Sequence, residues 1–414
     1  MLATILKSII RRGSLTLICA NGRAETIGTG EPHFTIRFHD RRAPWEMALQ
    51  PELKFGELYM DGRLTLEGAD IADLLGFFQM NLGTIKPGPF IRFQRGLRRV
   101  LRPLTQFNPA TRARKHVAHH YDLSGCLYDV FLDRDRQYSC AYYSAPDETL
   151  DEAQIGKKRH IAAKLYLNQP GLNVLDIGSG WGGLALDLAR DCGANVLGVT
   201  LSEEQFAVAN SRAKFADLAE RCKFELRDYR ALKGTFDRIV SVGMFEHVGA
   251  PHYPAFFAKI RDLLTEDGVA VLHTIGRSDG PGATNPWIAK YIFPGGYTPA
   301  LSEMLPVIER SGLVVTDVEV LRLHYAETLK EWRARFNARW DDIAKLYDER
   351  FCRMWEFYLA GAEMGFRHEG LVVFQLQMTK RIDALPITRD YMFEAERTMK
   401  FAGTEQMPKP KRVA

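Results

Sequence analysis

Short apolar runs alternate with amphipathic stretches between residues 173 and 277. Runs rich in Val, Leu and Ile, typical of buried strands, lie at 173–177, 194–202, 222–230, 236–248 and 268–276. Apolar residues recur at helical spacing between them, as at 203–218 and 253–264. This alternation predicts βαβ units and an α/β fold with a doubly wound, Rossmann-like parallel sheet.

The N-terminal residues follow a different pattern. Segments 14–19 and 34–39 alternate apolar and polar residues, turn signals follow at Asn21-Gly22 and Asp61-Gly62, and 69–78 has a helical pattern. Residues 1–13 predict an amphipathic helix that either docks on its own domain or lies on a membrane surface. We therefore predict a smaller α+β domain over residues 1–105.

The strand at 173–177 runs directly into a glycine-rich turn. Gly178, Gly180, Gly182 and Gly183 separate the strand from the next helix, so a ligand can approach the N–H groups of that helix closely. This predicts a nucleotide-type pocket at the carboxyl end of a parallel strand.

Two types of nucleotide site fit these glycines. A dinucleotide site would have Asp or Glu at the end of the next strand, where this chain has Thr200, Leu201 and Ser202. The acid instead precedes the glycines, at Asp176, which suits a cation better than a pyrophosphate. The order resembles the S-adenosylmethionine (SAM) loop of class I methyltransferases, whose ligand carries a sulfonium. Asp228, just after the third strand, is placed to contact the base of the ligand.

Composition narrows the class of protein. A length of 414 residues indicates two or three folded units, and a net charge of +4 is mild. The six cysteines show no C-x-x-C pair and no zinc spacing, so we expect no metal site and a reducing, cytoplasmic location. No apolar run approaches the roughly 20 residues that span a bilayer.

A basic stretch follows the N-terminal domain. No Asp or Glu occurs between Leu74 and Tyr121, and Phe and Leu residues interleave with arginines around 90–101. Such a face suits anionic phospholipid headgroups, while nucleic-acid binding is the alternative. We predict a basic linker at 106–120 and a basic tail at 401–414.

Motifs in a fixed order identify a family. The segments YSCAYYS, VLDIGSGWGG, GVTLSEEQ, RDYR, FDRIVSVGMFEHVG, VLHTIG and PWIAKYIFPGG resemble the cyclopropane-fatty-acyl-phospholipid synthases and mycolic-acid-modifying relatives. The resemblance runs from about residue 115 to 380, and the N-terminal region resembles, more weakly, the phospholipid-binding domain of the longer synthases. It implies a methyltransferase domain at 121–400 with a helical lid, or acyl-channel insertion, at about 285–365.

The resemblance also implies a reaction and a site. The SAM methyl group would be added to the cis double bond of unsaturated phospholipids at the inner face of the membrane, forming cyclopropanes, by a homodimer that binds no nucleic acid. A bound bicarbonate would act as base, held by side chains matching Glu246, His273 and Tyr325 and by backbone groups matching Cys140 and Ile275. The residues implied to bind SAM, besides Asp176, are Tyr138, Ser139, Gly178, Gly180, Gly182, Thr200, Leu201, Gln205 and Asp228.

The sequence departs from the family at one position. Many members carry a cysteine in the segment that reads YLAGAEMGFR here, and the matching residue is Ala362. Cys352 lies ten residues earlier, about 15 Å away on a helix. Methyl transfer does not need this cysteine, but ring closure is in doubt. Two alternatives therefore stay open: a lipid C-methyltransferase that makes methyl-branched unsaturated chains, and a non-enzymatic membrane-binding protein.

Overall fold

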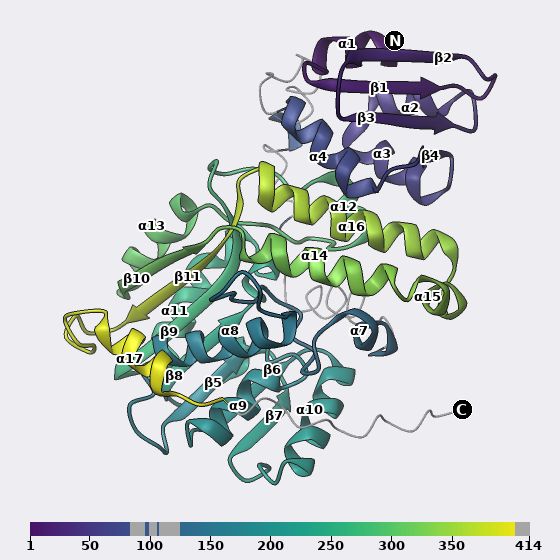
Figure 1. Ribbon diagram of the computed structural model, residues 1–414. Helices are drawn as coiled ribbons and strands as arrows, with labels where there is room; N and C mark the ends of the chain where they lie inside the picture. The colour runs from purple at the N-terminus through teal and green to yellow at the C-terminus, as the bar shows by residue number, and fades with distance from the viewer. Residues whose placement is uncertain (83–95, 99–105, 107–124, 402–414) are drawn as a thin grey trace. The chain divides into compact units, whose positions relative to one another are not determined.

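The computed structural model describes residues 1–82, 96–98, 106 and 125–401, and all helices, strands and contacts below are from this part of the chain (Figure 1). Apart from Gln106, the predicted basic linker at 106–120 lies outside the described residues, as does nearly all of the predicted tail at 401–414. The chain divides into two compact units. The first comprises residues 1–102, 282–294 and 326–371, and the second comprises 103–281, 295–325 and 372–414.

The first unit contains a small mixed sheet. Its strands are β1 (Gly13–Ile18), β2 (Ala24–Thr29), β3 (His33–Phe38) and β4 (Leu64–Glu67). They are ordered β2-β1-β3-β4, and β1 pairs parallel to β3 while the other pairs are antiparallel. The predicted strands at 14–19 and 34–39 are confirmed.

Helices complete this unit. They are α1 (Leu2–Ile9), α2 (Ala43–Leu49), α3 (Pro51–Met60), α4 (Ile71–Leu82), α12 (Pro286–Tyr291), most of α14 (His324–Asn337), α15 (Trp340–Leu346) and α16 (Glu349–His368). The helices α2 and α3 were not predicted from the sequence pattern. Both begin with a proline in the first turn, a favourable position for a helix start. Ala360 and Met364 of α16 are buried with Leu74, Phe77 and other residues of the N-terminal sheet and helices. Residues 326–371 therefore share the core of the N-terminal residues.

The second unit is a seven-stranded sheet covered by helices on both faces. Its strands are β5 (Asn173–Ile177), β6 (Asn195–Thr200), β7 (Cys222–Leu226), β8 (Phe236–Val242), β9 (Leu264–Arg277), β10 (Val314–Leu321) and β11 (Leu371–Thr379). The order is β10-β11-β9-β8-β5-β6-β7, with β5 to β9 pairing in parallel and β10 antiparallel to β11. The predicted doubly wound α/β sheet is confirmed, with an antiparallel strand pair added at one edge.

The helices of the second unit bury the apolar stripes that the sequence predicts. They are α7 (Gly125–Phe131), α8 (Leu150–Lys164), α9 (Gly183–Asp191), α10 (Glu203–Phe215), α11 (Tyr253–Leu263), α13 (Leu301–Ser311) and α17 (Asp390–Thr398), with short 3-10 turns η1 (Tyr229–Ala231), η2 (Phe245–His247) and η3 (Ala250–His252). One core cluster joins α11 and α13 to the sheet, and another joins α8, α9 and α10 to it. The strand β5 pairs with β6 on one side and with β8 on the other, so the strand order changes direction at β5. A ligand site is expected at the carboxyl ends of the strands at such a point.

Candidate active site

A pocket lies at the carboxyl ends of β5, β6 and β8. Its lining comes from the turns that follow these strands and from the segment before α8. The residues implied to bind SAM that line it are Tyr138, Ser139, Asp176, Gly178, Gly180, Thr200, Leu201, Gln205 and Asp228. The structure thus brings nine residues, distant in sequence, to one cavity.

Gly182 does not line the pocket. It lies just before α9 with φ of 85°, a left-handed conformation that favours glycine. A Cβ at this position would come within 2.6 Å of the Phe224 ring and 3.0 Å of the Ala209 methyl group. Gly182 therefore lets the turn pack against β7 and α10, and its contact with SAM stays a prediction.

The pocket-lining residues Asp176 and Asp228 differ in burial and in ion pairing. Asp176 is buried at the end of β5, and burial raises the pKa of its carboxyl to about 7, although the positive charge of Lys157 opposes this. Asp228 follows β7 and forms an ion pair with Arg230, at 2.6 Å between Oδ2 and Nη2. Asp176 is therefore an acid beside the glycine turn that forms no ion pair with any described residue.

Glu246 lies in η2, between the pocket-lining residues Met244 and His247. Its Oε1 accepts a 2.5 Å hydrogen bond from the backbone N–H of Ile275, while Oε2 is buried without a hydrogen-bond partner among the described residues. Burial raises the pKa of Glu246 to about 7, against hydrogen bonds that lower it. The carboxyl therefore exchanges a proton near neutral pH and has one oxygen available.

His273 lies on β9 and pairs in register with Val242 of β8, which lines the pocket. Nε2 of Gln375 lies 3.1 Å from Nδ1 of His273. Because an amide N–H donates, Nδ1 accepts and the ring carries its proton on Nε2. Burial, aided by the nearby Lys157 charge, holds the pKa of His273 well below its usual range, so the imidazole is neutral.

Cys140 and Tyr325 are both buried and do not line the pocket. The thiol of Cys140 donates to the carbonyl oxygen of Ala141, at 3.2 Å. The backbone N–H of Tyr143 donates to Nδ1 of His324 at 3.0 Å, which ties the Cys140 segment to the residue before Tyr325. The Tyr142 ring stacks on the His324 ring, with centroids 4.9 Å apart.

Ile275 differs from the expectation. Its backbone was implied to hold a bound anion, but its N–H donates to Glu246. The Thr274 hydroxyl donates to the Ile275 carbonyl oxygen at 3.1 Å. The backbone of Ile275 therefore orients Glu246 rather than offering a free donor.

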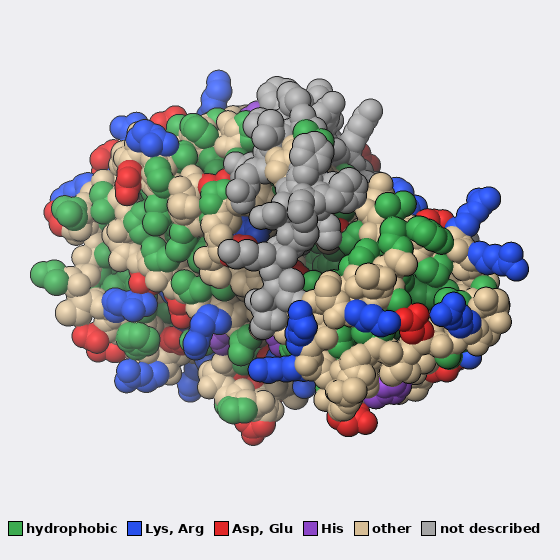
Figure 2. Space-filling model, turned by 90° about the horizontal axis from the view of Figure 1, so that it is seen from above, with side chains coloured by type: hydrophobic (Ala, Val, Ile, Leu, Met, Phe, Trp, Pro, Cys, Tyr) green, Lys and Arg blue, Asp and Glu red, His purple; other side chains and the backbone are tan. Residues whose placement is uncertain are grey.

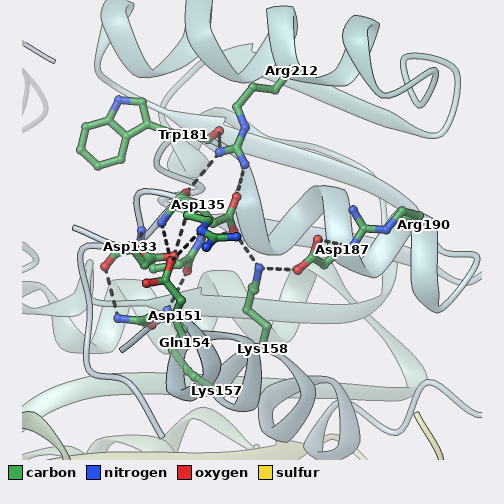
Figure 3. A network of polar contacts seen from close by, with 12 residues as sticks. Asp133, Asp135, Asp151, Gln154, Lys157, Lys158, Trp181, Asp187, Arg190 and Arg212 are labelled. Atoms are coloured by element: carbon green, nitrogen blue, oxygen red, sulfur yellow. Dashed lines mark hydrogen bonds and ion pairs between the residues drawn. The ribbon is translucent and has the colours of Figure 1, made fainter. Parts of the chain in front are cut away.

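A buried charge network adjoins the glycine turn and was not predicted (Figure 3). Asp135 forms ion pairs with Lys158, at 2.8 Å, and with Arg212, and Lys158 also pairs with Asp187. Arg212 donates to the carbonyl oxygen of Trp181 in the glycine turn, at 2.9 Å. The network thus connects α8, α9, α10 and the turn. The sequence signal was the run of charged residues on α8, which periodicity alone assigns to a solvated face.

Ala362 lies on α16 in the first unit, partly buried, directly before the buried Glu363. Oε1 of Glu363 accepts from Nε of Arg367 at 3.0 Å, and Oε2 lies 3.4 Å from Nε of Arg333. Cys352, on the same helix, is also buried. Burial raises the pKa of its thiol to about 11, so it is not a reactive thiolate near neutral pH.

Comparison with known proteins shows a family. Residues 108–376 match the mycolic acid cyclopropane synthetase family, and residues 1–81 match a domain of unknown function. A probable fatty acid methyltransferase of Pseudomonas putida is 41% identical over 67% of this chain and 73% of its own length. The cyclopropane-fatty-acyl-phospholipid synthase of Escherichia coli strain K12 is 41% identical over 64% and 67%. The tuberculostearic acid methyltransferase UfaA1 of Mycobacterium tuberculosis is 37% identical over 78% and 77%.

Solved structures give the same result. The cyclopropane synthase MmaA2 of M. tuberculosis is 33% identical, with a TM-score of 0.61, over 66% of this chain and 99% of its own. The mycolic acid cyclopropane synthase CmaA1, solved with S-adenosylhomocysteine (SAH), has the same identity, TM-score and coverage. Together with the pocket at the ends of β5, β6 and β8, these matches show that this chain belongs to the mycolic acid cyclopropane synthetase family of SAM-dependent, lipid-modifying methyltransferases.

Proposed function

We propose that this enzyme transfers the SAM methyl group to the cis double bond of unsaturated acyl chains in membrane phospholipids and forms cyclopropane fatty acids. The observation that carries the proposal is the Glu246 carboxyl. One of its oxygens is fixed by Ile275, and the other is buried without a hydrogen-bond partner among the described residues. A buried carboxyl oxygen in this state needs a partner, because leaving it without one costs on the order of 1–3 kcal/mol.

Bicarbonate fits this donor set. Its O–H would satisfy Oε2 of Glu246, and a carboxyl with a pKa of about 7 can instead share its own proton with an anion. The Oε1 of Gln375, beside His273, is also buried and without a partner among the described residues. Glu246, His273 and Tyr325 are the side chains that would hold the anion, with the Cys140 backbone.

The proposed reaction balances without an added oxidant or reductant. Bound SAM supplies an electrophilic methyl group, and bicarbonate supplies a base. The π pair of the alkene forms a bond to the methyl carbon as the C–S bond breaks and leaves its electrons on sulfur. One proton then leaves the transferred methyl group, and the C–H pair closes the ring. Glu246 and the neutral His273 would keep the base in place beside the pocket.

A second candidate has its own support. Without the family cysteine at Ala362, loss of a proton from the chain rather than from the methyl group would give a methyl-branched unsaturated product. Two relatives named above are fatty acid methyltransferases. Both reactions add one CH₂, so mass alone does not separate them.

The N-terminal unit has exposed apolar residues on two neighbouring helices, which support binding to a membrane surface. The helices α1 and α2 contact each other. Met1, which directly precedes α1, and Ile5 are exposed four residues apart, as are Trp45 (58% exposed) and Leu49 (53%) of α2. The exposed Arg41 and Arg42 precede α2. No described helix is long and apolar enough to cross a bilayer. We therefore propose peripheral binding to anionic lipid, at the cytoplasmic face, by an enzyme that is a homodimer.

Nucleic-acid methylation is a weaker alternative. On the face drawn in Figure 2, basic and acidic side chains are interspersed among the described residues. RNA or DNA binding with a steep salt dependence would favour that alternative.

The deciding experiment uses the purified full chain with SAM and vesicles of a cis-unsaturated phosphatidylglycerol, followed by proton NMR of the released fatty acids. We expect high-field cyclopropyl protons. Retained olefinic protons with a new methyl signal would establish the branched product instead. Vesicles of saturated lipid are the control, and no consumption of SAM with either lipid would overturn the proposal.

A further inference from the structure

Helix α8 carries three lysines whose side chains are almost completely buried, Lys157, Lys158 and Lys164. A buried ammonium is costly unless a carboxylate pairs with it, because the protein interior replaces hydration poorly. Lys158 pairs with Asp135 and Asp187, and Lys164 pairs with Glu319. Two of the three lysines therefore have the expected partner.

Lys157 does not. Its Nζ donates to Oε1 of Gln137 at 2.7 Å and to Oγ of Ser139 at 2.9 Å, and among the described residues it forms no ion pair. An ammonium has three N–H donors, so one remains without a described acceptor. The side chain is almost completely buried, so bulk water does not provide a general substitute.

Lys157 also lines the pocket that SAM requires. The other lysines and arginines in the described lining are Arg136, Arg227 and Arg230, and each pairs with a carboxylate: Asp129, Glu225 and Asp228. Among the lysines and arginines of the described lining, Lys157 is therefore the one that is not paired with a carboxylate. It can bind a negatively charged group of a ligand.

SAM has one such group. Its amino-acid end carries an α-carboxylate and an α-ammonium, while the adenosine is uncharged and the sulfur is cationic. The pocket holds opposite charges for this end: the Lys157 ammonium, and Asp176, which forms no ion pair within the described residues. Ser139, bonded to Lys157, is a residue that the family resemblance independently implied for SAM.

We propose that Lys157 binds the α-carboxylate of SAM and so fixes the amino-acid end of the cofactor in the pocket. The proposal rests on SAM binding, which follows from the family, and is independent of which lipid product forms. Fixing this end orients the sulfonium methyl group, because the methionine chain links the two.

The state of the lysine is consistent with this role. Burial lowers the pKa of Lys157 to about 8, although Asp133, Asp135 and Cys140 oppose the shift and Lys158 reinforces it; Asp176 also lies near. A carboxylate bound to Nζ would favour the protonated form. Affinity for a carboxylate ligand should then be full below about pH 8 and fall as the pH rises.

The test compares two ligands on two variants by calorimetry. SAH carries the carboxylate, and decarboxylated SAH lacks it but keeps the ammonium and the adenosine. In Lys157→Met, the Kd of SAH should rise by about ten- to a hundredfold, the range of a charge-assisted hydrogen bond, while the Kd of the decarboxylated ligand changes less than about twofold. Lys223→Met, at an exposed residue of β7, is the matched control and should bind both ligands as the wild type does.

Equal loss of both ligands, or loss of neither, would overturn the proposal. If Lys157→Met does not fold, the pH dependence of binding to the wild-type protein still tests the proposal. The ratio of its affinities for SAH and decarboxylated SAH should fall between pH 7 and about 9.5, as a lysine of lowered pKa loses its proton. A constant ratio would overturn the proposal, whereas failure of the lipid assay alone would leave the SAH result standing.

Discussion

The backbone N–H of Ile275 donates a 2.5 Å hydrogen bond to Oε1 of Glu246, while Oε2 of the same carboxyl is buried without a hydrogen-bond partner among the described residues. The strand β9 is thereby joined to the short turn η2, whose His247 lines the candidate pocket. A carboxyl with one oxygen held by a hydrogen bond and the other buried without a described partner is suited to bind a small polar group.

Glu246→Gln should abolish turnover while SAM affinity stays within about twofold, because the amide keeps the shape but cannot act as a carboxylate acceptor. Turnover is measured as SAH release with unsaturated vesicles, and affinity by calorimetry. The control is Glu303→Gln. The Glu303 carboxylate accepts hydrogen bonds from the Tyr297 hydroxyl and the Ala300 N–H, and it does not line the pocket. Full activity of Glu246→Gln would remove Glu246 from the proposed site.

The same substitution should change stability in a pH-dependent way. Burial raises the pKa of Glu246 from 4.5 to about 7, so the folded state holds this proton more tightly than the unfolded state. The free energy of unfolding of the wild type should therefore fall by up to roughly 3 kcal/mol between pH 4.5 and 7 from this group alone. Glu246→Gln lacks that loss, so its stability relative to wild type should increase from pH 5 to pH 8 in urea unfolding. A constant difference would contradict the buried, proton-sharing state.

Lys158→Met should destabilise the protein strongly. The change leaves the buried Asp135 and Asp187 without one of their cations, and breaking a buried pair typically costs about 3–5 kcal/mol. Thermal unfolding of the SAM-free protein measures the effect. Lys157→Met removes an ammonium that has no ion pair within the described chain, so its cost should be clearly smaller. Equal costs would contradict the distinction between the two neighbouring lysines.

Gln375→Leu should lower turnover about tenfold with little change in SAM affinity. Gln375 donates to Nδ1 of His273 and so fixes the ring and its tautomer, a contribution of the size of one buried hydrogen bond. Steady-state kinetics should show the loss in kcat, and calorimetry with SAH gives the affinity. Recovery in Gln375→Asn but not in Gln375→Leu would support positioning through the hydrogen bond, while a loss confined to SAH affinity would contradict it.

Gly182→Ala and Gly180→Ala should separate folding from ligand binding. Both residues have positive φ, but a Cβ at Gly182 would approach the Phe224 ring to 2.6 Å, whereas a Cβ at Gly180 meets no protein atom within 4 Å. Gly182→Ala should therefore lower the thermal midpoint far more. Gly180→Ala, which carries only the left-handed backbone cost of about 1–2 kcal/mol, should weaken SAH binding because Gly180 lines the pocket. The reverse ranking of thermal midpoints would contradict the steric argument.

The sequence by itself determined the alternation of strands and helices, the glycine turn after β5 and the family. These depend on local periodicity and on residues that are close in sequence, such as Asp176 and Gly178. It did not determine that, within the described residues, Lys157 forms no ion pair while Lys158 forms two, because their partners come from segments before α8 and from α9. It also did not indicate that Ile275 binds Glu246, or that residues 326–371 share a core with the N-terminal unit. Burial and pairing are properties of contacts between distant segments, so only the tertiary structure decided which charges are compensated and which are left for a ligand.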